Sequence, residues 1–200
     1  MSTHYVWFDT EYTRLELESA FLLQVAVLIT DVELTPLEPG GFQAFVSLPK
    51  GHEDAISDWV RQQIPHVVQG SQAEGLPTEQ IDARLAAYLD EVLGPAPESI
   101  GQRPILAGNS VHADWYLARR FLPTFLSRLH YRLLDVSSFK TEWQHHHSGE
   151  AFTKDDEANL KRFFPQARFR DGIGQHDAFY DVQASIAELA YYRAGLNGKS

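Results

Sequence analysis

The feature that most constrains the fold is the apolar run at residues 20–31 (AFLLQVAVLITD). Its β-branched and aromatic residues predict a strand, and its nearly continuous apolar character is typical of a strand covered on both faces. The run is too short to span a bilayer, and Gln24 interrupts it. We therefore expect a central strand of a layered domain and no membrane segment.

The order of the remaining elements indicates an α/β fold. Residues 4–9 and 42–48 read as strands on either side of this run, the second entered through a Glu-Pro-Gly-Gly turn, so an antiparallel meander is expected. Beyond it, apolar residues recur with the period of a helix and alternate with short strands. The predicted helices cover 78–93, 110–122 and 178–193, and the predicted strands cover 104–107 and 131–135.

Strands followed by alternating helices and strands predict an α/β layered domain. The 200 residues suffice for one domain, and we expect a single one over residues 1–200. The chain has no cysteine, which excludes disulfides, thiolate metal sites and a cysteine nucleophile. No secretory signal is visible at the N-terminus, so a cytoplasmic location is expected.

The charge balance limits the substrates that such a chain can hold. With 17 Lys and Arg against 27 Asp and Glu, the formal net charge is −10. Proteins that bind long nucleic acids gain much of their affinity by neutralising phosphates with basic side chains. A nucleic-acid substrate of this chain should therefore be short, with bound metal offsetting the local repulsion.

Two acidic residues, Asp9 and Glu11, lie near the end of the first predicted strand. Residues two apart in a strand point to the same face, so these carboxylates converge. Hard oxygen ligands suit Mg²⁺ or Mn²⁺. The alternative is a solvated strand end, since an Asp-x-Glu tripeptide arises easily in a chain with 27 acidic residues.

A third carboxylate, Asp114, shares a helical stripe with Leu117, Ala118 and Phe121. These positions face a core, where an unpaired carboxylate is costly. Its partner is either a metal ion or a buried Arg, Lys or backbone donor, and the sequence leaves this open.

His176 and Asp181 lie five residues apart, which on one helix separates them by roughly 140°. To converge, His176 must lie in the loop before the last helix, with Asp181 in its first turns. Gly172 and Gly174 make that approach irregular, and Asp177 is predicted to cap the helix. The alternative for His176 is an ordinary surface histidine, one of nine in the chain.

Together, the acidic pair, the middle-helix acid and the His-x4-Asp motif resemble the DEDD exonucleases, in the subgroup that uses a histidine base. Four segments resemble the oligoribonuclease family more closely. They are 8–15 (FDTEYTRL), 108–114 (GNSVHAD), 130–140 (HYRLLDVSSFK) and 185–193 (SIAELAYYR). Segments 49–103 and 144–175 show no comparable match.

The resemblance implies an RNase H-like exonuclease fold, with a five-stranded mixed sheet flanked by helices on both faces, in a homodimer. It implies 3′→5′ hydrolysis of short single-stranded RNA, down to dinucleotides, to nucleoside 5′-monophosphates. It also implies His176 as general base and two Mg²⁺ or Mn²⁺ ions. The implied metal ligands, which are catalytic together with the histidine, are Asp9, Glu11, Asp114 and Asp181.

Substrate contacts follow from the same resemblance. Leu15 corresponds to an apolar wedge against a base, Trp59 to an aromatic base platform, and Tyr131 of the partner subunit to a cover over the second base. The alternative for both aromatic residues is core or dimer packing. The residues that resemble the family's receptor for a terminal 5′-phosphate are Ser110, Arg132 and Ser137.

The chain departs from the family pattern at several positions. Arg14 replaces a glycine before the wedge leucine, Gln24 stands where an acidic residue is common, and Tyr180 replaces a second Asp before the last ligand. His66 has no assigned role, and the run 145–147 (HHH) reads as a solvated helix end. These departures bear on substrate length more than on the reaction.

Two alternative functions remain within this fold. The same five catalytic positions serve exonucleases that act on single-stranded DNA ends. A non-catalytic module that binds a dinucleotide is the third reading. The acidic composition and the 130–140 segment favour the short-RNA exonuclease.

Overall fold

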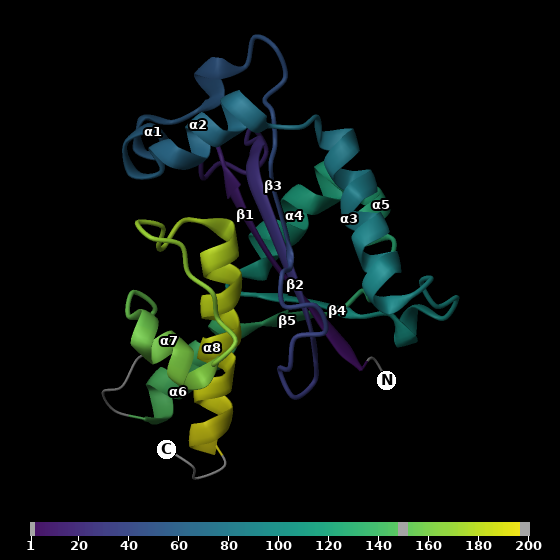
Figure 1. The fold of residues 1–200 in the computed structure, drawn as a ribbon, viewed down its shortest axis with the longest axis vertical. Helices are drawn as coiled ribbons and strands as arrows, with labels where there is room; N and C mark the ends of the chain where they lie inside the picture. Colours follow the sequence, from purple (N-terminus) through teal and green to yellow (C-terminus); the bar gives the residue numbers. More distant parts are fainter. Residues whose placement is uncertain (1–2, 148–151, 197–200) are drawn as a thin grey trace.

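The computed structural model describes residues 3–147 and 152–196, which form a five-stranded mixed sheet in the order β3-β2-β1-β4-β5 (Figure 1). The antiparallel part pairs β1 (His4–Tyr12) with β2 (Leu22–Asp31) and β2 with β3 (Phe42–Phe45). The parallel part pairs β1 with β4 (Ile105–Gly108) and β4 with β5 (Leu133–Asp135). The predicted meander and the five-stranded mixed sheet are confirmed.

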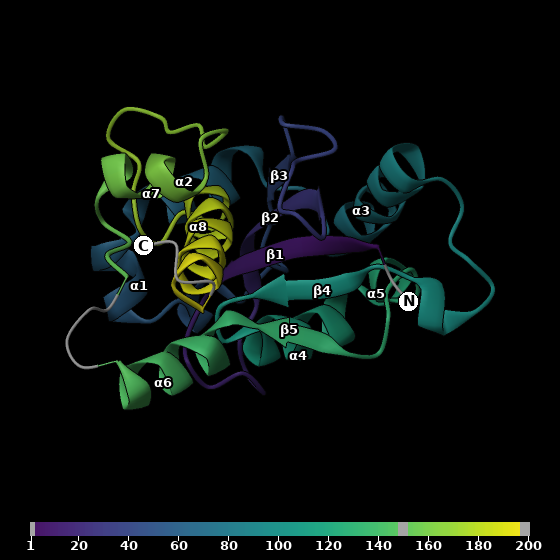
Figure 2. The same cartoon turned by 90° about the horizontal axis from the view of Figure 1, so that it is seen from below.

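Helices cover both faces of this sheet (Figures 1 and 2). On one face, α6 and α7 each pack against α8, and α8 lies along β1 and β2. On the other face, α3, α4 and α5 form the second core layer. The helix bounds are α1 Asp58–Gln63, α2 Pro65–Glu74, α3 Thr78–Leu93, α4 Val111–Phe121, α5 Pro123–Leu126, α6 Val136–His146, α7 Glu157–Phe163 and α8 Ala178–Leu196.

The central strands show why both faces need a helical layer. In β2 every residue from Leu22 to Thr30 is buried, as its apolar run predicts. Along β1, Trp7 belongs to the core beneath α8, whereas Val6 and Phe8 belong to the core beneath α4. This two-residue alternation sends Asp9 and Glu11 to the α8 face and Thr10 to the opposite face.

The three long helices predicted from periodicity, α3, α4 and α8, are confirmed within a few residues. The prediction missed the shorter helices α1, α2, α5, α6 and α7. The third strand ends at Phe45 rather than at residue 48. Val46 still donates to the Leu23 carbonyl of β2 at 2.8 Å and forms a separate bridge with Leu76. None of the helices in the described ranges is both long enough and apolar enough to cross a membrane.

The hairpin before β3 is joined closely to the start of α8. Gly41 has φ +62°, and a Cβ at this position would lie 2.5 Å from the ring of Phe179 and 2.7 Å from the carbonyl oxygen of Val27. Gly51 also has a left-handed backbone (φ +81°), but a Cβ at this position would have no other atom within 4 Å. Alanine at either glycine would strain the backbone, but only alanine at Gly41 would also overlap with neighbouring atoms.

Gly41→Ala is expected to lower the free energy of unfolding by about 2–5 kcal/mol, since backbone strain and overpacking add. Gly51→Ala, the matched control, bears only the strain and should cost about 1–2 kcal/mol. Urea denaturation of both variants measures the difference. Equal losses would contradict the close packing of the hairpin against α8.

Candidate active site

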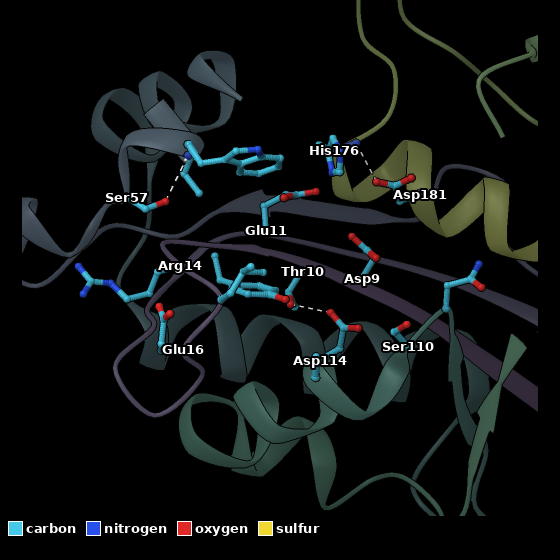
Figure 3. Close-up of a pocket in the computed structure, with 16 residues that line it drawn as sticks. Asp9, Thr10, Glu11, Arg14, Glu16, Ser57, Ser110, Asp114, His176 and Asp181 are labelled. Atoms are coloured by element: carbon cyan, nitrogen blue, oxygen red, sulfur yellow. Dashed lines mark hydrogen bonds between the residues drawn. The ribbon is translucent and has the colours of Figure 1, made fainter. Parts of the chain in front are cut away.

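A cavity of about 470 Å³ lies at the end of β1, between the start of α4 and the start of α8 (Figure 3). Asp9 and Glu11 of β1 point into it, as their shared strand face predicts. Asp114 enters from α4 and Asp181 from α8. The structure thus brings all four predicted carboxylates, from three elements, to one cavity.

Asp114 is held by a side-chain hydroxyl, a partner that its sequence pattern does not predict. Its side chain is only 5% exposed, and its Oδ1 accepts a hydrogen bond of 2.6 Å from the Thr10 hydroxyl. Thr10 lies on β1 between Asp9 and Glu11 and faces α4. Strand β1 therefore carries Asp9 and Glu11 on one face, and its Thr10, on the other face, fixes the carboxylate of Asp114.

His176 lies in the loop before α8, as predicted, with Asp181 in the first turn of the helix. Asp177 caps the helix as expected, since its Oδ1 accepts from the backbone N–H groups of Phe179 and Tyr180 at 3.2 Å each. His176 has a left-handed backbone (φ +65°), and its N–H donates to Asp181 Oδ2 at 2.8 Å. The left-handed turn brings the histidine back to the carboxylates.

The electrostatics of the cavity are those of crowded, partly desolvated anions. Burial, followed by repulsion from the other three carboxylates, holds the pKa of Asp9 well above its usual range. Burial and the neighbouring acids raise the pKa of Glu11 to about 9, and burial raises that of Asp114 to about 7 against the hydrogen bond from Thr10. Burial also raises the pKa of Asp181. These raised pKa values are expected where carboxylates lie close together and away from solvent.

One lysine partly relieves this repulsion. The positive charge of Lys154 acts to lower the pKa of Asp9 and of Asp181. Its Nζ lies 3.0 Å from Glu188 Oε2, and Glu188 is fully buried on α8. Glu188 also accepts from Asn109 Nδ2 at 2.9 Å and from the Tyr192 hydroxyl at 2.7 Å. Lys154 lies in segment 144–175, so the family resemblance gave no sign of it.

The donor set fits divalent metal ions. Ligand atoms of Glu11, His176 and Asp181 lie within 4.8 Å of one another. Within residues 3–147 and 152–196, none of the four cavity carboxylates forms an ion pair with Arg or Lys inside 4 Å. Oxygen ligands whose charges repel one another are the donors that Mg²⁺ and Mn²⁺ prefer. Asp9 and Asp114 line the same cavity and complete this set.

Apolar side chains form the outer rim of the cavity. Leu15 is 84% exposed and Trp59, on α1, is 53% exposed, so neither packs in the core. The Trp59 ring meets the His176 ring edge-on, with centroids 5.4 Å apart. Arg14 donates from Nε to the carbonyl oxygen of Ala55 at 2.7 Å and so joins the loop of Leu15 to the segment before α1.

The predicted phosphate-receptor residues divide into two groups. Ser110 lines the cavity, and its N–H donates to Ser137 Oγ at 2.9 Å and to Asp135 Oδ1 at 3.0 Å. Arg132 and Tyr131 do not line the cavity of this chain; the Arg132 guanidinium lies 5.6 Å from the centre of the exposed Tyr131 ring. Ser110 and Ser137 therefore lie together at the edge of the cavity, whereas Arg132 does not line it.

The remaining histidines lie outside the cavity. His66 is on α2, and its Nε2 is buried without a hydrogen-bond partner among the described residues. His145 and His146 end α6 as exposed side chains, as predicted, and His147 stacks on Trp143 with ring centroids 3.7 Å apart.

Glu11→Gln is expected to stabilise the metal-free protein at alkaline pH. Because the pKa of Glu11 rises from 4.5 to about 9 on folding, the wild type loses stability as the pH increases across that window. Glutamine does not titrate, so its free energy of unfolding should exceed the wild-type value by ~1 kcal/mol or more at about pH 8, and by less at about pH 4. Urea denaturation in EDTA measures this.

The exposed Glu18→Gln is the matched control and should leave the pH dependence unchanged. Identical pH profiles for Glu11→Gln and the wild type would contradict the proposed repulsion.

Comparison with known proteins places the chain among nucleases. The family model described as "Exonuclease" (RNase_T) matches residues 6–189. An oligoribonuclease of Streptomyces coelicolor is 33% identical over 98% of this chain and 88% of its own length. A mitochondrial oligoribonuclease of Homo sapiens is 30% identical over 98% of this chain and 74% of its own length.

Solved structures share the fold at lower identity. A product-bound exonuclease I superposes with a TM-score of 0.66 at 15% identity, over 98% of this chain and 44% of that one. Exonuclease I of Methylocaldum szegediense gives a TM-score of 0.61 at 19% identity, over 98% of this chain and 41% of that one. The chain thus spans less than half of these larger nucleases. With the sheet order and the matched region, these comparisons show that the chain belongs to the RNase T exonuclease family, with an RNase H-like fold and oligoribonucleases among its relatives.

Proposed function

We propose that this protein is a 3′→5′ exoribonuclease that hydrolyses short single-stranded RNA, down to dinucleotides, to nucleoside 5′-monophosphates. The observation that carries the proposal is the convergence of four carboxylates and His176 in one cavity with an apolar rim. Oligoribonucleases at 30–33% identity over nearly the whole chain support the substrate class. The single domain proposed for residues 1–200 contains the four carboxylates and His176.

Asp9, Glu11, Asp114 and Asp181 would hold two divalent ions, Mg²⁺ or Mn²⁺. When bound, such ions neutralise charge that develops on the phosphate oxygens during an in-line displacement. The protein contributes the arrangement of the ligands. Thr10 fixes the Asp114 carboxylate, the His176 N–H fixes that of Asp181, and the strand fixes the Asp9 and Glu11 backbone.

His176 would act as the general base that removes a proton from the attacking water. Its ring lies beside the carboxylates, is exposed to solvent and is flanked by Trp59. Histidine changes its charge near neutral pH, which suits it to accept the proton there. The Asp181 carboxylate accepts a hydrogen bond from the His176 backbone N–H. The proposed metal ligand and the proposed base are therefore held in place by the same contact.

The base-binding residues would be Leu15 as a wedge and Trp59 as a stacking platform. Base–aromatic stacking contributes about 1–3 kcal/mol per base and tolerates any sequence. In the proposed homodimer, Tyr131 of the partner subunit covers the second base and Arg132 joins Ser110 and Ser137 around the 5′-phosphate. Tyr131 is 64% exposed next to the edge strand β5, which supports burial by a second copy. A cytoplasmic location stays a prediction.

Asp9→Ala is expected to abolish RNA hydrolysis, because it removes a carboxylate from the centre of the ligand set. His176→Ala should lower kcat by about 100- to 10,000-fold, the usual contribution of general base catalysis. The assay follows 5′-labelled RNA of two, four and seven nucleotides, with matched DNA, in Mg²⁺ and in Mn²⁺.

Asp58→Ala, on the exposed start of α1, is purified in parallel and should keep full activity. Full activity of Asp9→Ala would contradict the proposal. DNA cleavage as fast as RNA cleavage would favour the single-stranded DNA exonuclease, and tight dinucleotide binding without turnover would favour a binding module.

Ser137→Ala tests the phosphate receptor. It is expected to raise KM for a 5′-phosphorylated dinucleotide about tenfold, roughly the loss of one hydrogen bond, and to leave KM for the 5′-hydroxyl form unchanged. Its exposed neighbour gives the control Ser138→Ala, which should alter neither value. An equal effect on both substrates would remove Ser137 from the phosphate site.

A further inference from the structure

A buried glutamine supports the loop that carries His176. Gln24 is 1% exposed and pairs with Glu11 across the β1–β2 ladder. Its Nε2 donates to Asp177 Oδ2 at 2.8 Å, and its Oε1 accepts from the Ala178 N–H at 3.0 Å. Both polar atoms of the amide are thus used at the start of α8, 153 positions along the chain.

Asp177 transmits this support to its neighbour. It is 3% exposed, and while Oδ2 accepts from Gln24, Oδ1 caps α8. Its N–H donates to the Gly174 carbonyl at 3.2 Å, and its carbonyl accepts from the Asp181 N–H at 3.0 Å. His176 immediately precedes this anchored residue and has the left-handed φ of +65°, a conformation that needs support from its surroundings.

The hydrogen-bond polarity at this contact admits only particular residue pairs. The Ala178 N–H must face an oxygen, and Asp177 Oδ2 must face a donor, so an amide suits position 24. Glutamate there would put a second carboxylate oxygen against Asp177. Asparagine at position 177 would put its N–H₂ against that of Gln24. With both changes, the new amide at position 177 would donate to the new carboxylate at position 24, and that carboxylate would still accept from the Ala178 N–H.

We propose that Gln24 is a positioning residue for the hydrolytic reaction, which through Asp177 holds the His176 backbone in the turn that directs its ring to the cavity. The Gln24 amide makes its hydrogen bonds to Asp177 and Ala178, so it would act on the reaction through the loop that these residues hold. The inference rests on the proposed function, in which His176 is the base. The positioning role gives a reason for the amide of Gln24, rather than an acid, at the position paired with Glu11.

The test is a double-mutant cycle on dinucleotide hydrolysis with saturating Mn²⁺. Gln24→Glu and Asp177→Asn are each expected to lower kcat by about 10- to 100-fold, as expected for a misplaced catalytic group, with KM changed by no more than about twofold. The double variant should recover kcat to within about threefold of the wild type, because its hydrogen bonds are complementary again. Gln80→Glu, on the exposed face of α3, is the matched control and should act as the wild type.

A second variant at position 24 keeps the test decisive if the charged substitution Gln24→Glu prevents folding. Gln24→Met removes both hydrogen bonds at similar volume and adds no charge, and it should reproduce the fall in kcat. Wild-type kcat in Gln24→Met or Gln24→Glu, or a folded double variant no more active than the single ones, would overturn the inference.

A spectroscopic readout separates this inference from the proposed function. The NMR signal of the His176 ring, assigned by its absence in His176→Ala, should shift in both single variants and return in the double variant. An active His176→Ala enzyme would refute the base assignment, whereas the NMR cycle would still report whether Gln24 and Asp177 hold the loop. An unchanged signal in the single variants would refute the positioning role alone.

Discussion

Mutual repulsion among the four cavity carboxylates is the constraint on which the rest of the structure depends. Asp9 and Glu11 come from β1, Asp114 from α4 and Asp181 from α8, so both helical layers must be fixed against the sheet to bring them together. Burial and neighbouring charges raise the pKa of all four. Keeping such anions close together costs stability, and the surrounding packing must offset this cost.

A buried polar network provides part of that support. Glu188 lies fully buried beneath the site and binds Lys154, Asn109 and Tyr192. Asn109 in turn accepts from Ser137 at the start of α6, at 3.2 Å. Because each buried polar group has a partner, the network costs little and joins α8, the end of β4 and α6 in one arrangement. Ser137, of the proposed phosphate receptor, is thereby joined to α8, the helix that carries Asp181.

Sequence reasoning found the elements whose signal is local and repeated. The buried strand β2, the long helices α3, α4 and α8, and the loop position of His176 all follow from periodicity or spacing. Short helices such as α7 offer too few turns for a periodic signal. Its N-cap is Asp156, whose Oδ1 accepts from the Ala158 N–H at 2.9 Å. The family resemblance implied the proposed metal ligands as a set, whereas spacing alone left their role open.

Supporting residues escaped prediction because their partners lie far along the chain. Thr10 binds Asp114 across 104 positions and Gln24 binds Asp177 across 153, so no local pattern identifies either pair. Thr10 is a residue type common in strands, whereas Gln24 interrupts an apolar run, and only the folded arrangement gives either of them a role. Gln24 departs from the family pattern, and its hydrogen bond to Asp177 gives a physical reason for this departure.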